Sequence, residues 1–297
     1  THLVGGGVND LGNIGFMPCV MDKDQDLLSL PIQSTPFWWS SFDKSSESAS
    51  PGFYSTVLTT PRIDVGLTAI SSFAGVHKYQ WMELHNDKLP TIVLDMCHEA
   101  KLKTGDDAPC VQANISIDAD TNKFTGAVYK SHGLSGNIWI YISGEIEIKS
   151  SGGLEVLDVH TCTAANAKDS TATCTTDRSG TSSSGVLFSA VRFAQPAGSA
   201  QGDLSLQRLD VEIKVGISFI SEALATQNLQ DALSETTDLG KLSERTKHTW
   251  CNLLHEVEVD VLPGLYGATN SSVDDLTVVV NSAHYRSMMS PTTYTES

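Results

Sequence analysis

Residues 136–150 read GNIWIYISGEIEIKS, and isoleucine occupies every second position from 138 to 148 except at Gly144. A period of two puts alternate side chains on opposite faces of an extended chain, which is typical of a β-strand with one buried face. The aromatic residues between the isoleucines also favour a strand. The stretch therefore predicts either a pair of strands or one long bent strand.

The same alternation recurs on both sides of this stretch, from residue 53 to residue 220. Gly, Ser, Asp and Asn separate the runs, as expected for antiparallel strands joined by turns. So many strands predict a mainly β fold with a large antiparallel β-sandwich. Residues 163–185 are rich in Ser, Thr, Ala and Gly, and we expect an exposed loop there. The clearest strand runs are FYSTVLTT (53–60), IDVGLTAI (63–70), PTIVLDMC (90–97) and LSLQRLDVEIKVGISFI (204–220).

Helical spacing of apolar residues begins near residue 221. We expect helices in 221–233 and 238–260, and a third that starts near Ser272, a suitable N-cap. The second helix is expected to carry one apolar stripe, made of Leu242, Thr246, Trp250, Leu253, Leu254 and Val257. The predicted division is a β-sandwich lobe at 1–220, incomplete at its N-terminus, a helical linker at 221–262, and the start of a truncated helical domain at 263–297.

The chain is acidic, with 35 acidic and 19 basic side chains and a formal net charge of −16. No run of basic residues stands out, so we expect no nucleic-acid partner, because the phosphate backbone is bound by clustered Lys and Arg. No run of about 18 apolar residues occurs, so we expect no membrane partner. The acidity itself indicates only solubility.

Six cysteines are spread over the chain without a Cys-x-x-Cys pair, which argues against a zinc ribbon or a thioredoxin-type site. Cys97 and Cys110 flank one polar loop, and Cys162 and Cys174 flank another. Each of these pairs is a candidate disulfide.

Two sequons, Asn114-Ile-Ser and Asn270-Ser-Ser, are candidate N-glycosylation sites. Glycans and disulfides are both added in the secretory pathway. Together with the cysteine pairs, the sequons predict a protein that is secreted or lumenal.

The opening residues THLVGGGVNDLG are rich in glycine. A dinucleotide-binding loop needs Gly-x-Gly-x-x-Gly, and the third glycine position is Asp10 here. The Gly-Lys-Ser/Thr of a phosphate-binding P-loop is also lacking. The side chains of His2, Asn9 and Asp10 could form hydrogen bonds with a polyol. The competing interpretation is a tight surface turn in which glycine adopts positive φ. The candidate substrate-binding residues are His2, Gly5, Gly6, Gly7, Asn9 and Asp10.

Other residues that attract attention have ordinary explanations beside the functional one. Glycosidases use two carboxylates, but Asp43 and Glu47 are four residues apart in an expected loop, and we favour a solvated loop. Trp38 and Trp39 suit either a sugar platform or the core. His77 lies on one face of an expected strand. The sequence contains neither His-Glu-x-x-His nor Gly-x-Ser-x-Gly, so it indicates no zinc hydrolase and no serine nucleophile.

Six segments together resemble one known family, in the family's order and across the whole chain. Each is modest alone, but six in register make coincidence improbable. The segments are THLVGGGVNDLGNIGFMP (1–18), FDKSSESASPGFYSTVL (42–58), VGLTAISSFAGVHKYQW (65–81), VEIKVGISFISEALATQNLQDAL (211–233), HTWCNLLHEVEVD (248–260) and NSAHYRSMMSPTTYTES (281–297). The family they resemble is glycoside hydrolase family 92, the calcium-dependent exo-α-mannosidases.

The resemblance implies an enzyme of two lobes, in which helical linkers join a β-sandwich to an (α/α)6 domain. It implies an active site between the lobes, a calcium ion that binds mannose, and an inverting reaction with a Glu acid and an Asp base. In such a reaction the two carboxyls stand roughly 6.5–9.5 Å apart. The acid, the base and the main calcium ligands are expected beyond Ser297, so no catalytic residue is assigned within this chain and its metal ligands are unassigned.

The chain starts at Thr1 without a methionine, and we interpret it as the β lobe of a longer enzyme, inactive by itself. Its expected partners are a mannose-containing glycan and the helical catalytic domain. The α-1,2 linkage is the one we consider first. Gly6, Lys44 and Ser72 depart from the family's Thr, His and Arg. These departures leave two alternatives: a non-catalytic secreted carbohydrate-binding or structural β-sandwich, and an unrelated carbohydrate-active sandwich.

Overall fold

The computed structural model describes most of the chain with full side chains, except at 110, 130–132, 136–137 and 270–274, where only the backbone is described. The described residues are 14–32, 38–84, 86–97, 110–118, 120–132, 136–149, 154–165, 171–182, 185–195, 208–257 and 270–288.

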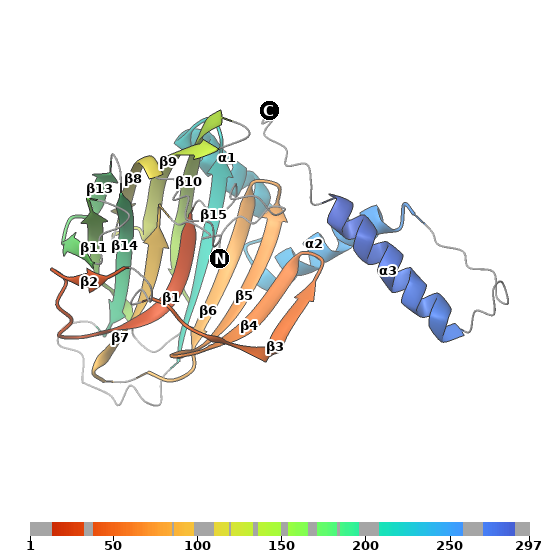
Figure 1. Ribbon diagram of the computed structural model, residues 1–297, viewed down its shortest axis with the longest axis horizontal. Coiled ribbons are helices and arrows are strands. Elements are labelled where there is room, and N and C mark those ends of the chain that lie inside the picture. The colour runs from red at the N-terminus through yellow and green to blue at the C-terminus, as the bar shows by residue number, and fades with distance from the viewer. Residues whose placement is uncertain are drawn as a thin grey trace.

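Two antiparallel sheets make up the described β region (Figure 1). The smaller has the order β1-β7-β14-β11-β12-β2 and the larger the order β13-β8-β9-β10-β15-β6-β5-β4-β3. The predicted mainly β, antiparallel fold is confirmed. The strands are β1 Gly15–Asp22, β2 Leu30–Pro31, β3 Phe42–Ser50, β4 Phe53–Thr59, β5 Arg62–Ser71, β6 Ala74–Trp81, β7 Lys88–Asp95, β8 Cys110–Asp118, β9 Lys123–His132, β10 Gly136–Ile148, β11 Glu155–Ala164, β12 Thr171–Thr175, β13 Ser179–Ser182, β14 Val186–Ala194 and β15 Leu209–Ser218.

The stretch GNIWIYISGEIEI is one strand, β10, so the expectation of a strand pair is ruled out and that of one long strand holds. It pairs with β9 along one side and with β15 along the other. Gly144 interrupts the isoleucine pattern because a Cβ there would lie 2.4 Å from Cζ of Phe124 and 2.3 Å from the carbonyl oxygen of Lys214. The alternate isoleucines thus reach the interior, and the glycine makes room for a phenylalanine of the next strand.

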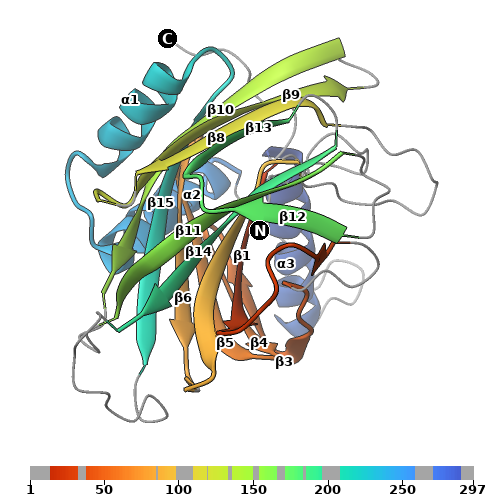
Figure 2. The same cartoon turned by 90° about the vertical axis from the view of Figure 1, so that its left-hand side faces the viewer.

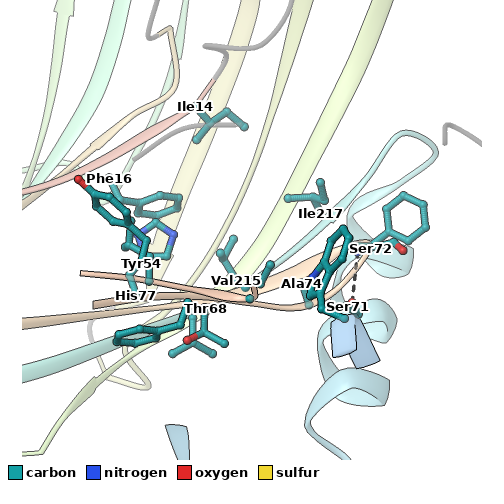
Figure 3. A pocket seen from close by; sticks show the side chains of 18 of the residues that line it. Ile14, Phe16, Tyr54, Thr68, Ser71, Ser72, Ala74, His77, Val215 and Ile217 are labelled. Atoms are coloured by element: carbon teal, nitrogen blue, oxygen red, sulfur yellow. Dashed lines mark hydrogen bonds between the residues drawn. The ribbon is translucent and has the colours of Figure 1, made fainter. Parts of the chain in front are cut away.

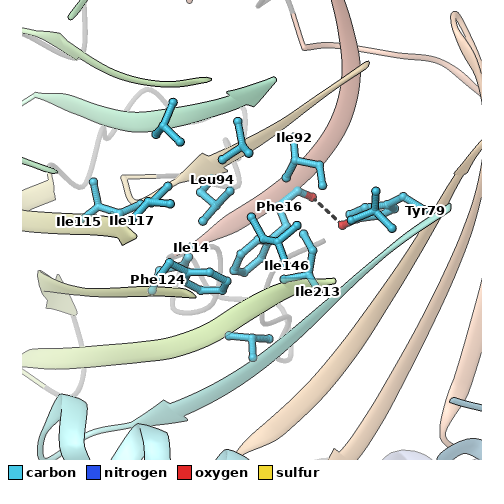
Figure 4. Close-up of a cluster of buried hydrophobic side chains, with 14 of the residues drawn as sticks. Ile14, Phe16, Tyr79, Ile92, Leu94, Ile115, Ile117, Phe124, Ile146 and Ile213 are labelled. Atoms are coloured by element: carbon cyan, nitrogen blue, oxygen red, sulfur yellow. Dashed lines mark hydrogen bonds between the residues drawn. The ribbon is translucent and has the colours of Figure 1, made fainter. Parts of the chain in front are cut away.

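The main core lies between the two sheets (Figure 4). Strands from both sheets contribute fully buried side chains, among them Trp81, Ile92, Phe124 and Phe193. A second cluster, around Phe188 and Leu30, lies on the other face of the smaller sheet, because β14 alternates Phe188 with the core residue Leu187. The smaller sheet is therefore buried on both faces, which explains the nearly continuous apolar run of β7 and β14.

Residues 163–185 are not the exposed loop that we expected. They complete β11 and contain two short strands: β12 pairs with β11, and β13 joins the larger sheet through β8. The alternation is present in TATCT, where Ala172 and Cys174 are buried. Small side chains hid it, because Ala and Cys give a weaker signal than large apolar residues.

Two side chains of β6, in the opposite sheet, donate hydrogen bonds to backbone carbonyls of β1. The Tyr79 hydroxyl donates to the carbonyl oxygen of Phe16 at 3.3 Å, and the Trp81 indole N–H donates to that of Cys19 at 3.0 Å. Edge strands with open carbonyls pair readily with other chains. By register the carbonyl of Phe16 faces the open edge of β1 and that of Cys19 faces β7, so the two donors fasten one sheet to the other and the Tyr79 hydroxyl also covers one edge carbonyl.

All three predicted helices are present: α1 Glu222–Leu233, α2 Leu239–Leu254 and α3 Asn270–Met288. Ser221 caps α1 and Asp238 caps α2, each by accepting from a backbone N–H. Figure 2 shows α1 across the outer face of the larger sheet, where it contacts β15 and β10. Among the described helices, none combines the length and apolar character needed to cross a bilayer.

The apolar stripe expected along the second helix is only partly correct. Leu242 is fully buried and Thr246 donates to the carbonyl oxygen of Ala69 at 2.9 Å. However, α2 ends at Leu254, and both Leu253 and Val257 are exposed. The helix thus packs on the sheet with its first half and leaves the sheet with its second half.

Candidate functional site

A cavity of about 590 Å³ is lined by residues of β4, β5, β6, β10 and β15, together with Ile14 and Phe16 at the beginning of β1 (Figure 3). Strand register builds its floor. Tyr54 of β4 lies opposite Leu67 of β5, and Leu67 lies opposite His77 of β6. Because directly opposed residues point to the same face of a sheet, these three side chains form a row across three strands.

Helices α2 and α3 complete the cavity at one end. Trp250 of α2 and Tyr285 of α3 both line it, and their ring centroids are 4.7 Å apart. Gly52, in the turn between β3 and β4, has a φ of +82°, and a Cβ there would lie 2.3 Å from Cγ2 of Thr246 in α2. The turn therefore needs glycine for its backbone conformation and for its contact with the helix.

His77 lies in the floor of the cavity without carrying a charge. Its Nδ1 is 2.8 Å from the hydroxyl oxygen of Tyr79, and its ring packs edge-on against Phe16 at 5.1 Å. Burial lowers the pKa of His77 to about 3, because the imidazolium ion loses its hydration there. At neutral pH the side chain is thus a neutral hydrogen-bonding group.

A carboxylate stands at the rim. Oε1 of Glu47 accepts a 2.9 Å hydrogen bond from the Tyr54 hydroxyl, and Oε2 accepts one from Lys44. The bond from Lys44, together with that from Tyr54, lowers the pKa of Glu47. Hydrogen bonds from Ser45 likewise lower the pKa of Asp43. Both carboxylates are held ionised, and neither has the raised pKa of a general acid.

The expectation that Asp43 and Glu47 lie in a loop is wrong, because both lie in the edge strand β3. Its pairing with β4 shifts register between Asp43 and Ser48, so Glu47 is in a bulge. Bulges re-aim side chains, and this one turns Glu47 towards Tyr54. A serine-rich polar stretch gives no strand signal, since an edge strand needs no buried face.

The chemistry available to the cavity is that of an uncharged binding site. Among the described residues that line it, none is Asp, Glu, Lys or Arg. The described part of the chain also has no group of three or more His, Cys, Asp and Glu placed to hold a metal ion. The described lining can therefore bind an uncharged, partly apolar ligand, but glycosidic hydrolysis needs two carboxylates that it does not supply.

The predicted glycine-rich binding residues, His2, Gly5, Gly6, Gly7, Asn9 and Asp10, lie outside the described residues, so their role stays a prediction. The described chain begins at Ile14, which lines the cavity. Of the two tryptophans, Trp38 packs on Phe188 with ring centroids 4.9 Å apart, as a core residue does. Trp39 is exposed.

The predicted pair Cys162 and Cys174 is disulfide-bonded, and the two residues face each other on β11 and β12. Cys97 is also disulfide-bonded, while the side chain of its predicted partner Cys110 is outside the described part. Cys19 is a buried free thiol, and burial raises its pKa.

Both predicted glycosylation sites stay predictions. Asn114 lies in β8 between β9 and β13, and its Oδ1 accepts from the backbone N–H of Ala127 at 3.0 Å. Asn270 begins α3, and its side chain is not described.

Sequence reasoning did not single out Phe16, Tyr54, Leu67 or Tyr285, which the structure brings together around the cavity. A signal was nevertheless present, because each lies in one of the six family-like segments. In fact every one of the six segments contributes lining residues, although they are spread from residue 1 to residue 297. Outside these segments, the described lining contains Ile140 and Ile142 of β10.

Comparison with known proteins identifies the family of this two-sheet lobe with its attached helices. Residues 1–218 match the glycosyl hydrolase family 92 N-terminal domain, and the chain belongs to this family. A comparison with curated proteins finds no match.

Solved structures confirm the fold. The family GH92 α-mannosidase BT3965 from Bacteroides thetaiotaomicron is 18% identical with a TM-score of 0.63, over 88% of this chain and 31% of that protein. The structure of the same enzyme in complex with mannoimidazole is also 18% identical with a TM-score of 0.63, over 88% of this chain and 30% of that protein. The inverting mannosidase BT2199 of Bacteroides thetaiotaomicron VPI-5482 is 18% identical with a TM-score of 0.56, over 83% of this chain and 27% of that protein. This chain therefore spans about a third of the length of these enzymes.

Proposed function

We propose that this chain is the β lobe of a secreted exo-α-mannosidase that releases terminal α-mannose from glycans, α-1,2-linked mannose being the first linkage to test. The observation that carries the proposal is the convergence of all six family-like segments on one cavity. Segments far apart in sequence gather at one place when they serve one site. The solved relatives are mannosidases, one of them with mannoimidazole bound, which supports a mannose-containing ligand.

In this proposal the lobe binds and orients, and it leaves bond cleavage to groups outside this chain. The described lining is uncharged, and the carboxylates of Asp43 and Glu47 on β3 are kept ionised, so in this proposal a raised-pKa acid and a base come from the helical domain that follows in the longer enzymes. The calcium ion, when bound, polarises sugar hydroxyls as a Lewis acid. No calcium ligand is assigned within this chain, and we place the ligands in that helical domain as well.

The disulfide-bonded cysteines are the basis on which we propose that the protein is secreted. The Cys162–Cys174 disulfide lies within the described sheet, and a second disulfide involves Cys97. Disulfides persist in oxidising compartments and are rare in reducing ones. The two sequons add glycosylation at Asn114 and Asn270 to the proposal, which peptide mapping after glycosidase treatment tests.

The function is tested by assaying the parent protein, with its helical domain, on a panel of α-mannosides. We expect release of free mannose that EDTA abolishes and calcium restores. This chain alone serves as the matched control and should release none. If the parent protein releases no mannose from any α-mannoside in the presence of calcium, the proposal is wrong.

A further inference from the structure

Lys44, Glu47 and Tyr54 form a chain of contacts from the surface to the cavity. Each carboxylate oxygen of Glu47 accepts one hydrogen bond, one from the ammonium of Lys44 and the other from the hydroxyl of Tyr54. Lys44 is largely exposed, with 80% of its side chain accessible, whereas Glu47 is 27% accessible. The carboxylate is thus held from both sides, and it fixes the outer end of the tyrosine ring.

The inner part of that ring is a wall of the cavity. Tyr54 lies opposite Leu67 in the row that continues to His77, and Figure 3 shows its ring beside Phe16 and His77. An aromatic face offers an apolar surface, and a pyranose ring has an apolar face of C–H groups. An uncharged cavity with an aromatic wall suits the stacking of such a ring.

The contacts between Lys44, Glu47 and Tyr54 contribute little to the stability of the fold. Their main effect is to fix the position of the Tyr54 ring. Lys44 and Glu47 form an ion pair at an exposed strand edge, and pairs of this kind contribute little to the stability of a fold. The turn between β3 and β4 is already set by Gly52 and its contact with α2. Removal of the pair therefore leaves the strand in place and frees the tyrosine ring to rotate.

We infer that Tyr54 determines specificity by stacking on the terminal sugar, and that Glu47 and Lys44 are positioning residues that hold its ring. This inference rests on the function proposed above and deepens it, because it names the surface that recognises the sugar from the β lobe. Lys44 stands where the family motif has His. Both residue types donate to a carboxylate, so this departure keeps the positioning contact.

The test uses the parent enzyme and its steady-state kinetics on an α-mannoside. Tyr54→Ala is expected to raise KM about tenfold with kcat within about twofold, as for loss of uniform binding. Tyr54→Phe and Glu47→Gln are each expected to raise KM about threefold, and the double variant by no more than either alone, because they remove one coupled contact. Lys44→His should keep KM within about twofold, because the donor is retained.

Two controls separate recognition from general damage. Glu235→Gln breaks an ion pair with Arg245 at an exposed position away from the cavity and should leave KM unchanged. Thermal melting identifies any variant that fails to fold, and Tyr54→Phe and Glu47→Gln decide the matter if Tyr54→Ala does not fold. Equal losses of kcat and melting temperature with constant KM would mean a structural role and overturn the inference.

The failure of this inference is distinguishable from failure of the proposed function. An active parent enzyme whose KM is the same in all Tyr54 and Glu47 variants refutes the stacking role and leaves the mannosidase proposal intact. A parent enzyme that hydrolyses no α-mannoside refutes both.

Discussion

Arg192 and Asp158 face each other on adjacent strands of the smaller sheet and form a two-point ion pair. Nε of Arg192 donates to Oδ1 at 2.7 Å and Nη2 donates to Oδ2 at 2.6 Å. Nη2 also lies 3.0 Å from Nε2 of His160. The arginine side chain is 10% accessible and the aspartate side chain 29%, so the pair is largely removed from water.

Asp158→Asn should therefore be strongly destabilising. The buried guanidinium would lose its counter-charge, and we expect a loss of about 2–3 kcal/mol of unfolding free energy in urea denaturation. The matched control is Asp120→Asn, which breaks an exposed pair with Arg178 at 3.8 Å. That variant should stay within about 0.5 kcal/mol of the wild type. Equal effects of the two substitutions would contradict the prediction.

The same pair predicts a loss of stability in strong acid. Burial alone raises the pKa of Asp158, but hydrogen bonds from His160 and Arg192 outweigh it and lower the pKa from 3.8 to about 2. A carboxyl group whose pKa is lower in the folded than in the unfolded chain stabilises the fold fully at pH values above the unfolded pKa, 3.8. This contribution is lost as the pH falls from 3.8 towards 2. The loss is about 2 kcal/mol, and Asp158→Asn should lack this component of the acid dependence.

His77 predicts a second pH dependence at higher pH. Its pKa is about 3 when folded and 6.5 ordinarily, so the unfolded chain binds a proton between these values and the folded chain does not. Stability is fully present above pH 6.5 and is lost as the pH falls towards 3, by about 1.4 kcal/mol per pH unit. His77→Gln should reduce the slope between pH 4 and 6 by one proton. An unchanged slope in denaturation at several pH values would show that another group is responsible.

Two glycines on the larger sheet should differ strongly in their tolerance of one added methyl group. A Cβ at Gly216 would lie 2.2 Å from the carbonyl oxygen of Ala225, so Gly216→Ala must push α1 away from β15. A Cβ at Gly66 would meet Phe53 at an ordinary 3.6 Å. We expect Gly216→Ala to cost about 2 kcal/mol or more, and Gly66→Ala to stay within about 1 kcal/mol. Thermal melting compares the two directly, and equal losses would argue against tight packing of α1.

Strands and helices with a strong period were predictable from sequence. The isoleucines of β10 specify a strand whatever the rest of the chain does, and the capped helices α1 and α2 began within a residue of the expected positions. Strands without large apolar residues were not predictable. In β12 the buried positions are Ala172 and Cys174, and β3 buries no continuous face at all.

The cavity was beyond sequence reasoning for a different reason. Tyr54, His77 and Tyr285 are joined only by sheet register and helix packing, neither of which is visible along the chain. The resemblance had nevertheless marked all the segments involved. It indicated which parts of the chain matter, while the residues first considered for chemistry, Asp43 and Glu47, turned out to be held ionised on the edge strand β3.

The hydrogen bonds that Tyr79 and Trp81 donate to β1 yield the last prediction. Tyr79→Phe removes one donor to Phe16 and should cost about 1 kcal/mol. Trp81→Phe removes the donor to Cys19 and leaves a space in a fully buried site, so we expect about 2–4 kcal/mol. In both variants, hydrogen exchange should rise most in β1, because this strand loses one of its two hydrogen bonds to the opposite sheet. Tyr129→Phe is the control, since Tyr129 lies in β9 of the other sheet and its ring packs on Trp139 in β10 with centroids 5.0 Å apart. Exchange that rises uniformly over the molecule, without a local maximum in β1, would show that the two side chains stabilise the core alone and do not fasten β1.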